Sequence, residues 1–417
     1  MAQSSLRWHS VEMARQAARR ALPRAVFDFI DGGADDEAAL RGNVAQFEAY
    51  RLLPTIGVNV AERDQSAVLF GRRYASPLGI GPTGLAGLAR PEAELMLMRA
   101  AEAMNVPFTL STVSSTSIEE IGDAARRSHW FQLYILRNRA ISFRLMERAA
   151  KAGFDTLVVT MDCPVAAHRE RDLANSFALP YRPSLGAIFD TLLHMPWLLR
   201  LALNGAPQPV NMIEAAGTNG ALSLLAFMDS QLDPSVTWHD VRELRRFWNG
   251  ALVIKGILSA NDVEQAINVG ADGIIVSNHG GRQLGASASP LFQLPAITER
   301  ANGRLTVIYD SGIRRGMDAV KAVALGADGL LVGRPTLFGV AADSFKGAKK
   351  ILELFRADID RTMALIGARA LADIKASAAV IDQPAQPVSR PAQFSKIGAN
   401  DQVVAANKQI SSGTSEE

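Results

Sequence analysis

Short apolar segments alternate with longer amphipathic segments through the middle of this chain. The apolar segments contain many Val, Ile and Leu residues, and each is followed by enough chain for a helix. Such runs are typical of strands that are buried on both faces of a parallel sheet. We predict eight strands, over residues 77–84, 108–111, 130–134, 156–162, 251–255, 273–277, 305–310 and 329–333.

One pair of segments also repeats in sequence. Gly270–Ser277 and Gly326–Gly333 both carry Gly-Ala-Asp-Gly followed by apolar residues. Each is typical of a helix end, a tight turn and a buried strand. Eight such units favour the α/β class and a closed (β/α)8 TIM barrel. The alternative is an open doubly wound sheet, but that fold favours a phosphate-binding loop after its first strand, which the sequence lacks.

Three regions lie outside the predicted barrel, which occupies about residues 77–370. We predict a helical segment over residues 1–76 and a long insertion after the fourth strand, over about 165–235. Residues 376–417 lack apolar periodicity and are rich in Ala, Gln, Ser, Pro and Gly, which predicts a disordered tail. Residues 1–375 are therefore expected to form a single domain.

The insertion contains an apolar segment over about residues 185–204. Asp190, His194, Pro196 and Arg200 interrupt it, so it is a poor candidate for a membrane span. Two interpretations remain open with equal weight. The segment lies in a bilayer interface as a peripheral membrane contact, or it packs as a lid or a subunit contact.

Composition and charge limit the classes of partner. The net charge is only +2 and the chain has no long basic block, so no nucleic-acid partner is expected. The single cysteine, Cys163, excludes an intrachain disulfide and fits a reducing compartment, so we expect a cytoplasmic protein. Cys163 is interpreted as a small packing residue at a strand end; the alternative is a nucleophile, for which the sequence assigns no partner histidine. No His, Cys or Asp cluster has metal-ligand spacing, so no catalytic metal is expected.

The most informative motif is Ser-Asn-His-Gly-Gly-Arg-Gln over residues 277–283, at the end of the sixth predicted strand. In parallel barrels the chemistry lies where the strands end. His279 can transfer a proton near neutral pH, and Arg282 can bind a carboxylate with two hydrogen bonds. The alternative interpretation is a loop histidine beside a solvated arginine.

Polar residues also end the third and fourth strands. Gln132 and Tyr134 point to one face of their strand, as do Thr160 and Asp162. Asp162 is a candidate for orienting a histidine and holding its positive form. Taken singly, each of these residues is equally well explained as a satisfied polar residue of the barrel.

Several cations are placed at the same mouth. Lys255 ends the fifth strand, where its amine can form a Schiff base or neutralise a cofactor anion. Arg169 follows the fourth strand and, with Arg282, would make a carboxylate site. Arg314 and Arg334 stand with glycines after the seventh and eighth strands, where barrels commonly bind phosphate.

These motifs resemble those of the FMN-dependent 2-hydroxy-acid oxidases and dehydrogenases. The resemblance covers about residues 8–370, and residues 169–172 look most like the mandelate dehydrogenase branch. It implies FMN as cofactor and the same TIM barrel. The motifs that carry it are Gly-Pro-Thr-Gly at 81–84, Phe-Gln-Leu-Tyr at 131–134, the motif at 277–283, and Asp-Ser-Gly-Ile-Arg-Arg-Gly at 310–316.

The resemblance also implies roles for the site residues. His279 is the base, Asp162 supports its protonated form, Arg169 and Arg282 bind the substrate carboxylate, and Tyr134 bonds the substrate hydroxyl. The residues implied to bind the cofactor are Pro82, Thr83, Gly84, Ser111, Gln132, Thr160, Lys255, Ser277, Asp310, Gly312, Arg314, Gly333 and Arg334.

The implied reaction is oxidation of a small L-2-hydroxy acid, such as lactate or mandelate, to the 2-oxo acid. Electrons pass to a quinone, a cytochrome or another acceptor, with contact at the inner face of the membrane through about residues 185–204. The alternative is an oxidase that reduces oxygen to hydrogen peroxide. Homo-oligomers are common in the family, so one is expected here.

One departure bears on the substrate. The family pattern resembles Tyr-Asp-Tyr, whereas this chain has Phe27-Asp28-Phe29, so Phe29 lacks the hydroxyl that bonds the substrate carboxylate. An altered substrate or a lost activity is therefore a further alternative. A Schiff-base aldolase using Lys255 is a third, which the set of His279, Arg282 and Arg169 disfavours.

Overall fold

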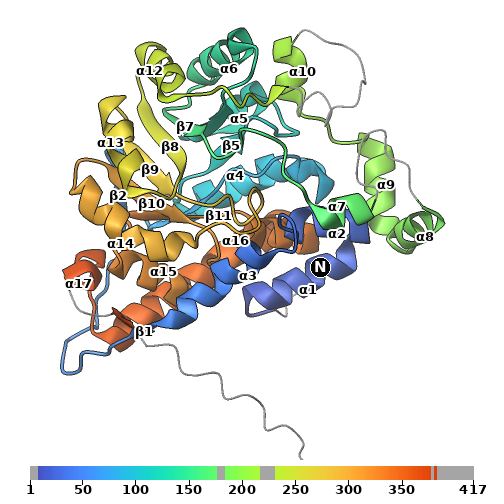
Figure 1. The fold of residues 1–417 in the computed structure, drawn as a ribbon. Helices are drawn as coiled ribbons and strands as arrows, with labels where there is room; N and C mark the ends of the chain where they lie inside the picture. Colours follow the sequence, from blue (N-terminus) through green and yellow to red (C-terminus); the bar gives the residue numbers. More distant parts are fainter. Residues whose placement is uncertain (1–7, 176–183, 217–230, 377–379, 383–417) are drawn as a thin grey trace, which may run out of the picture. The chain divides into compact units, whose positions relative to one another are not determined.

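The computed structural model of the protein describes residues 8–175, 184–216, 231–376 and 380–382 (Figure 1). Eight parallel strands form one sheet in the order β4-β11-β10-β9-β8-β7-β6-β5. A parallel bridge between Ile80 and Phe108 links its two ends, so the predicted TIM barrel is confirmed. The strands are β4 (Leu78–Ile80), β5 (Thr109–Ser111), β6 (Trp130–Tyr134), β7 (Thr156–Thr160), β8 (Ala251–Ile257), β9 (Gly273–Val276), β10 (Thr306–Asp310) and β11 (Gly329–Val332).

The barrel interior changes from apolar to polar along the strands. Trp130, Val158 and Val253 belong to a buried cluster that fills the interior near the N-terminal ends of the strands. Two residues further along each strand the same face carries Gln132, Thr160 and Lys255, all buried. The polar groups are therefore collected at the C-terminal mouth, where this fold places its chemistry.

The segment before the barrel is only partly helical. It contains α1 (Val11–Ala21), α2 (Arg24–Asp31), α3 (Ala38–Ala45) and the short 3-10 helix η1 (Gln46–Ala49). After these, β2 (Ala67–Leu69) and β3 (Arg72–Tyr74) form a hairpin whose Leu69 and Tyr74 pack into the apolar interior cluster. The prediction of a helical segment to residue 76 is thus wrong for the hairpin, since apolar residues spaced two apart face the core there.

Helices follow the strands and surround the barrel (Figure 1). A capping box of Ser117 and Glu120 begins α5, because each side chain accepts a hydrogen bond from the backbone N–H of the other residue. α16 bends at Asp343 and Ser344, whose backbone angles are not helical. The helices are η2 (Ala86–Leu88), α4 (Ala93–Met104), α5 (Ile118–Ala124), α6 (Arg139–Lys151), α12 (Trp238–Phe247), α13 (Ala260–Asn268), α14 (Pro290–Ala301), α15 (Gly316–Ala324) and α16 (Arg334–Ile366).

The insertion after β7 carries four helices within its described residues. They are α7 (Glu170–Ala174), α8 (Leu185–Leu193), α9 (Met195–Asn204) and α10 (Val210–Ala216). At the other end of the chain, α17 (Leu371–Ala376) precedes β12 (Val380–Asp382), which pairs antiparallel with β1 (Tyr50–Leu52). The disorder predicted from residue 376 is therefore wrong for residue 376 and for 380–382, and the rest of that tail, 377–379 and 383–417, lies outside the described residues.

Candidate active site

His279 and Asp162 form the centre of the site. His279 follows β9 with a left-handed φ of 58°, and its backbone N–H donates to Ser277 Oγ at 3.0 Å. A side chain held in that backbone region is costly and is common at functional sites. His279 Nδ1 lies 2.9 Å from Asp162 Oδ1, just after β7. The carboxylate therefore fixes the ring orientation of the histidine.

Burial and charge set the protonation of this pair. Burial lowers the pKa of His279 below its ordinary value, although Asp162 opposes this effect. Burial disfavours ionisation of Asp162, but His279 and Lys255 outweigh it and lower the pKa of this carboxyl. Near neutral pH the pair is a neutral imidazole beside a carboxylate, which is the state of a general base.

Lys255 is a buried, paired cation. Its Nζ donates to Ser277 Oγ at 2.8 Å and lies 3.4 Å from Asp310 Oδ2. Burial lowers the pKa of Lys255, but Asp310 and Asp162 outweigh it, and the net pKa is raised. A charged ammonium is not a nucleophile, which argues against a Schiff base at this position.

A cavity of about 530 Å³ opens beside these groups at the C-terminal mouth. Three of the predicted residues lie one layer behind it: Asp162 bonds His279, Thr160 bonds Gln132, and Ser277 bonds Lys255. The others line the cavity: Pro82, Thr83, Gly84, Ser111, Gln132, Tyr134, Arg169, Lys255, His279, Arg282, Asp310, Gly312, Arg314, Gly333 and Arg334.

A chain of side-chain hydrogen bonds forms one wall. Ser111 Oγ donates to Gln132 Oε1 at 3.2 Å, and Gln132 Nε2 donates to Thr160 Oγ1 at 3.0 Å. These residues come from the adjacent strands β5, β6 and β7: Ser111 is the register partner of Gln132, and Thr160 lies two residues beyond the partner of Gln132 on β7. The chain fixes the amide orientation and presents donors and acceptors toward the cavity.

Arginines also line the cavity. Arg282 donates to the carbonyl oxygens of Phe29 and Gly32, each at 2.9 Å, and Arg334 donates to those of Gly32 and Gly280 at 2.7 and 2.9 Å. The end of α2 thus holds both guanidinium groups in place. Carbonyl oxygens bring no negative charge, so the cations remain uncompensated on that side.

Without a bound anion, burial of these charged guanidinium groups is energetically unfavourable. Burial, with the positive charge of Arg314 nearby, lowers the pKa of Arg334 to about 9. Burial also lowers the pKa of Arg282, and the positive charge of Arg169 lowers it further. Arg169 Nε is buried without a hydrogen-bond partner among the described residues. Buried cations of this kind are stabilised when an anion occupies the space between them.

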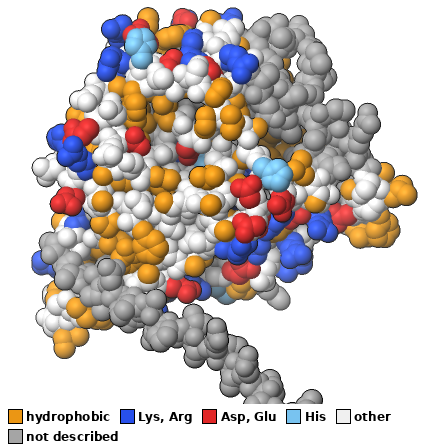
Figure 2. All heavy atoms as spheres, in the orientation of Figure 1, with side chains coloured by type: hydrophobic (Ala, Val, Ile, Leu, Met, Phe, Trp, Pro, Cys, Tyr) orange, Lys and Arg blue, Asp and Glu red, His pale blue; other side chains and the backbone are white. Residues whose placement is uncertain are grey.

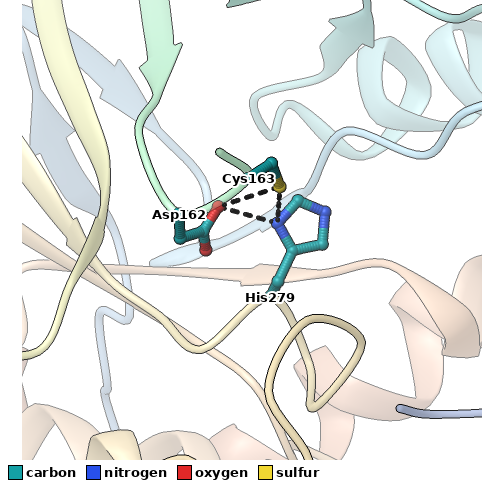
Figure 3. Close-up of side chains that lie close together, drawn as sticks. All are labelled: Asp162, Cys163 and His279. Carbon is teal, nitrogen blue, oxygen red and sulfur yellow. Dashed lines mark hydrogen bonds and ion pairs between the residues drawn. The ribbon is translucent and has the colours of Figure 1, made fainter. Parts of the chain in front are cut away.

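Two features of the site were missed or misread from the sequence. Cys163 is more than a packing residue, because its Sγ lies 3.4 Å from His279 Nδ1 (Figure 3). Arg171 links α7 to α2, with ion pairs to Asp31 at 3.0 Å and to Glu37. No spacing in the sequence announces either contact, since the partners are more than a hundred residues apart.

The outer surface beside the mouth is apolar on α8 and α9. Trp197 packs inward and donates to Leu88 O at 2.8 Å, while many other apolar side chains of these helices face outward. Figure 2 shows such side chains gathered at the right edge, over α8. No helix among the described residues is long and apolar enough to cross a membrane. The outward-facing residues are Leu185, Ile188, Phe189, Leu192, Leu193, Met195, Leu199 and Leu203.

Comparison with known proteins gives a family match over most of the chain. The model of the FMN-dependent dehydrogenase family matches residues 18–381. The chain belongs to the FMN-dependent dehydrogenase family. The predicted FMN cofactor and the predicted class of oxidoreductase are therefore confirmed, and the aldolase alternative is set aside.

Relatives of known activity cover nearly the whole family region. The chain is 42% identical to an (S)-mandelate dehydrogenase of Pseudomonas putida over 358 residues, which is 86% of this chain and 90% of that protein. It is 40% identical to an L-lactate dehydrogenase of Pseudomonas paraeruginosa over 368 residues, which is 88% of this chain and 96% of that protein.

Solved structures show the same fold. A crystal structure of the monotopic membrane protein (S)-mandelate dehydrogenase matches with a TM-score of 0.86 and 39% identity, covering 90% of this chain and all of that one. A mandelate oxidase matches with a TM-score of 0.75 and 34% identity, covering 88% of this chain and 98% of that one. Dehydrogenases and an oxidase thus share this fold, so the fold alone does not name the electron acceptor.

Proposed function

We propose that the protein oxidises an L-2-hydroxy acid to a 2-oxo acid, with FMN bound in the 530 Å³ cavity. The observation that carries the proposal is the position of His279. A neutral histidine, oriented by Asp162, faces the same cavity as Arg169 and Arg282. A base and two carboxylate-binding cations around one space match the functional groups of a 2-hydroxy acid.

The residues around the cavity fit FMN. Gly333 and Arg334 lie at the start of α16, where backbone N–H groups and a helix N-terminus favour a phosphate, and Gly312 and Arg314 line the same cavity from the loop between β10 and α15. The lowered pKa of Arg334 supports an anion site there, because a nearby anion would stabilise the charged guanidinium. Asp310 is placed to accept hydrogen bonds from the ribityl hydroxyls.

The opposite part of the cavity fits the flavin ring. Ser111 and Gln132 offer the polar edge, with Thr160 holding the Gln132 amide from behind and the backbone of residues 82–84 also lining the cavity. Lys255 offers a positive charge and is held by Ser277. A fixed cation favours negative charge that develops on a bound ring during reduction. When bound, FMN supplies the acceptor for the two electrons that leave the substrate.

The substrate-binding residues set the orientation of the reaction. Arg169 and Arg282 bind the carboxylate, and Tyr134 bonds the hydroxyl, so the α-carbon is held in one pose. His279 accepts a proton on the ring nitrogen that faces away from Asp162. That proton comes from the hydroxyl if hydride leaves the α-carbon, or from the α-carbon in a carbanion route. Asp162 stabilises the imidazolium formed in either case.

The proposed substrate class is lactate-like or mandelate-like. Gly84 and Val113 both line the cavity as small residues, and a Cβ added at Gly84 would crowd Val113 Cβ at 3.3 Å, so a larger residue at position 84 would require Val113 to shift. Phe29 lines the cavity with its ring 5.3 Å from Arg282 Cζ, so an aromatic face replaces the hydroxyl of the family pattern. This environment favours a side chain larger than that of glycolate.

We further propose a quinone or a cytochrome as acceptor and peripheral contact with the inner face of a membrane through residues 185–204. The exposed apolar side chains of α8 and α9 support this contact, and a relative is described as a monotopic membrane protein. Oxygen, with release of hydrogen peroxide, is the alternative acceptor. A homo-oligomer is proposed from the resemblance alone.

Anaerobic mixing of the purified yellow protein with L-lactate, (S)-mandelate and other L-2-hydroxy acids tests the reaction. We expect one class to bleach the oxidised flavin rapidly, with its D-enantiomer as the matched control. Later addition of oxygen or of a quinone analogue then identifies the acceptor by the rate at which the flavin colour returns. A yellow protein that no 2-hydroxy acid bleaches would contradict the proposed function.

A further inference from the structure

Cys163 is a third donor at the histidine–aspartate pair. Its Sγ lies 3.4 Å from His279 Nδ1 and 3.3 Å from Asp162 Oδ1, while these two atoms are 2.9 Å apart (Figure 3). The thiol comes from the loop after β7 and the imidazole from the loop after β9. A sulfur, a nitrogen and an oxygen donor thus form a small triangle beside the substrate cavity.

The arrangement does not match a nucleophilic triad. In such triads the nucleophile and the acid contact opposite nitrogens of the histidine ring. Here Cys163 and Asp162 both contact Nδ1, so the ring cannot relay a proton between them. Burial and the Asp162 carboxylate also raise the pKa of the thiol well above its usual value, so it is not a free thiolate.

The triangle does match one face of a zinc coordination sphere. Zn²⁺ binds thiolate at about 2.3 Å and imidazole or carboxylate at about 2.0–2.2 Å. Tetrahedral angles then place the donors about 3.4–3.6 Å apart, so the two sulfur separations change by roughly 0.3 Å or less and the separation between Nδ1 and Oδ1 must increase by about 0.5 Å. We propose that Asp162, Cys163 and His279 form a Zn²⁺ site whose occupation inhibits the enzyme.

The charges around the site are compatible with the metal. Binding replaces the thiol proton of Cys163, so Zn²⁺ with one thiolate and the Asp162 carboxylate is neutral overall; the neutral imidazole of His279 binds through Nδ1 and keeps its one proton on Nε2. Lys255 Nζ lies 3.9 Å from Asp162 Oδ2, but Asp310, at 3.4 Å, balances its charge.

Occupation of the site would block the proposed reaction, and this consequence rests on the proposed function. A metal on Nδ1 and Asp162 removes the pair that stabilises the imidazolium. Cys163 and His279 both line the substrate cavity, so the fourth coordination position of the metal faces the space that the 2-hydroxy acid needs. Zn²⁺ and the substrate should therefore compete.

The first test does not depend on activity. Cys163 is the only cysteine in the chain, so a thiolate–metal absorption band reports this site alone. Chelator-treated holoprotein, titrated with Cd²⁺, should show a saturable ultraviolet thiolate-to-cadmium band that Zn²⁺ displaces. The Cys163→Ser variant carries the same flavin background and should lack the band. Absence of the band from the unsubstituted protein would overturn the proposal.

The second test measures inhibition. In anaerobic flavin reduction, Zn²⁺ should raise the apparent substrate concentration for half-maximal rate. In Cys163→Ser we expect Zn²⁺ to act at least about tenfold more weakly, because loss of even an outer-shell partner commonly costs 10–100-fold in metal affinity. Equal inhibition of both proteins, or a cadmium band without inhibition, would overturn the inhibitory site. If no 2-hydroxy acid reduces the flavin, the proposed function fails while the cadmium titration still decides the metal site.

Discussion

The barrel mouth and the α8–α9 surface lie in one domain but differ in what they bury: the mouth buries charged groups, whereas the α8–α9 surface exposes apolar ones. At the mouth, charged groups are buried, and each is oriented by fixed partners, as His279 is by Asp162 and Arg282 by two carbonyl oxygens. On α8 and α9, apolar groups are exposed, with Leu185 at 86% and Leu203 at 85% of full exposure.

In the protein without a bound partner, both arrangements are energetically unfavourable. The buried guanidinium groups of Arg282 and Arg334 bond carbonyl oxygens rather than carboxylates, and the exposed side chains of α8 and α9 lack an apolar environment. Each points to a missing partner of complementary chemistry: an anionic cofactor with an anionic substrate at the mouth, and a lipid surface at α8–α9. The two regions should therefore respond to different substitutions.

The largest expected effect concerns the mouth. His279→Gln removes the base, and we expect substrate-dependent flavin reduction to fall by roughly 10²–10⁴-fold while FMN stays bound. Stopped-flow absorbance measures the reduction. His239→Gln, at an exposed histidine of α12, is the matched control and should reduce at the normal rate. Rapid reduction in His279→Gln would refute the base assignment.

A smaller effect is expected at α8. Phe189→Asp removes an exposed aromatic side chain, worth about 1.5–3 kcal/mol when buried in an apolar phase, so binding to lipid vesicles should weaken roughly tenfold to a hundredfold. Vesicle sedimentation measures this binding, and flavin reduction should be unchanged.

Ile56→Asp supplies the control for this experiment. Ile56 is 92% exposed in the loop between β1 and β2, outside α8 and α9, and its replacement should leave vesicle binding intact. Equal losses in the two variants, or no vesicle binding by the unsubstituted protein, would refute the interface role of α8–α9.

The smallest expected effect tests Phe29. Phe29→Tyr adds a hydroxyl beside Arg282 in the cavity, where one charge-assisted hydrogen bond to the substrate carboxylate is worth about 1.5–3 kcal/mol. The hydration that the new hydroxyl loses on binding offsets part of this free energy. We therefore expect the KM for L-lactate to fall about tenfold. Steady-state kinetics measure the change. An unchanged or higher KM would show that Phe29 does not limit the binding of small substrates.

The sequence alone determined the barrel and most of the residues at its mouth. Strands such as Thr156–Thr160 and Gly273–Val276 are local apolar runs, and their C-terminal ends must meet once the sheet closes. The same rule places Lys255, His279 and Asp310 together without any knowledge of distances. The Phe29 departure is also visible in sequence, because it lies within a short motif.

Only the tertiary structure decided which atoms touch. Asp162 and His279 are 117 residues apart, and their 2.9 Å contact depends on the pairing registers of β7, β8 and β9. The same registers bring Cys163 to the histidine and turn an apparent packing residue into a donor. Hydrophobic periodicity is a local property and can be read along the chain, whereas distances between polar atoms depend on how several strands and the loops that follow them settle together.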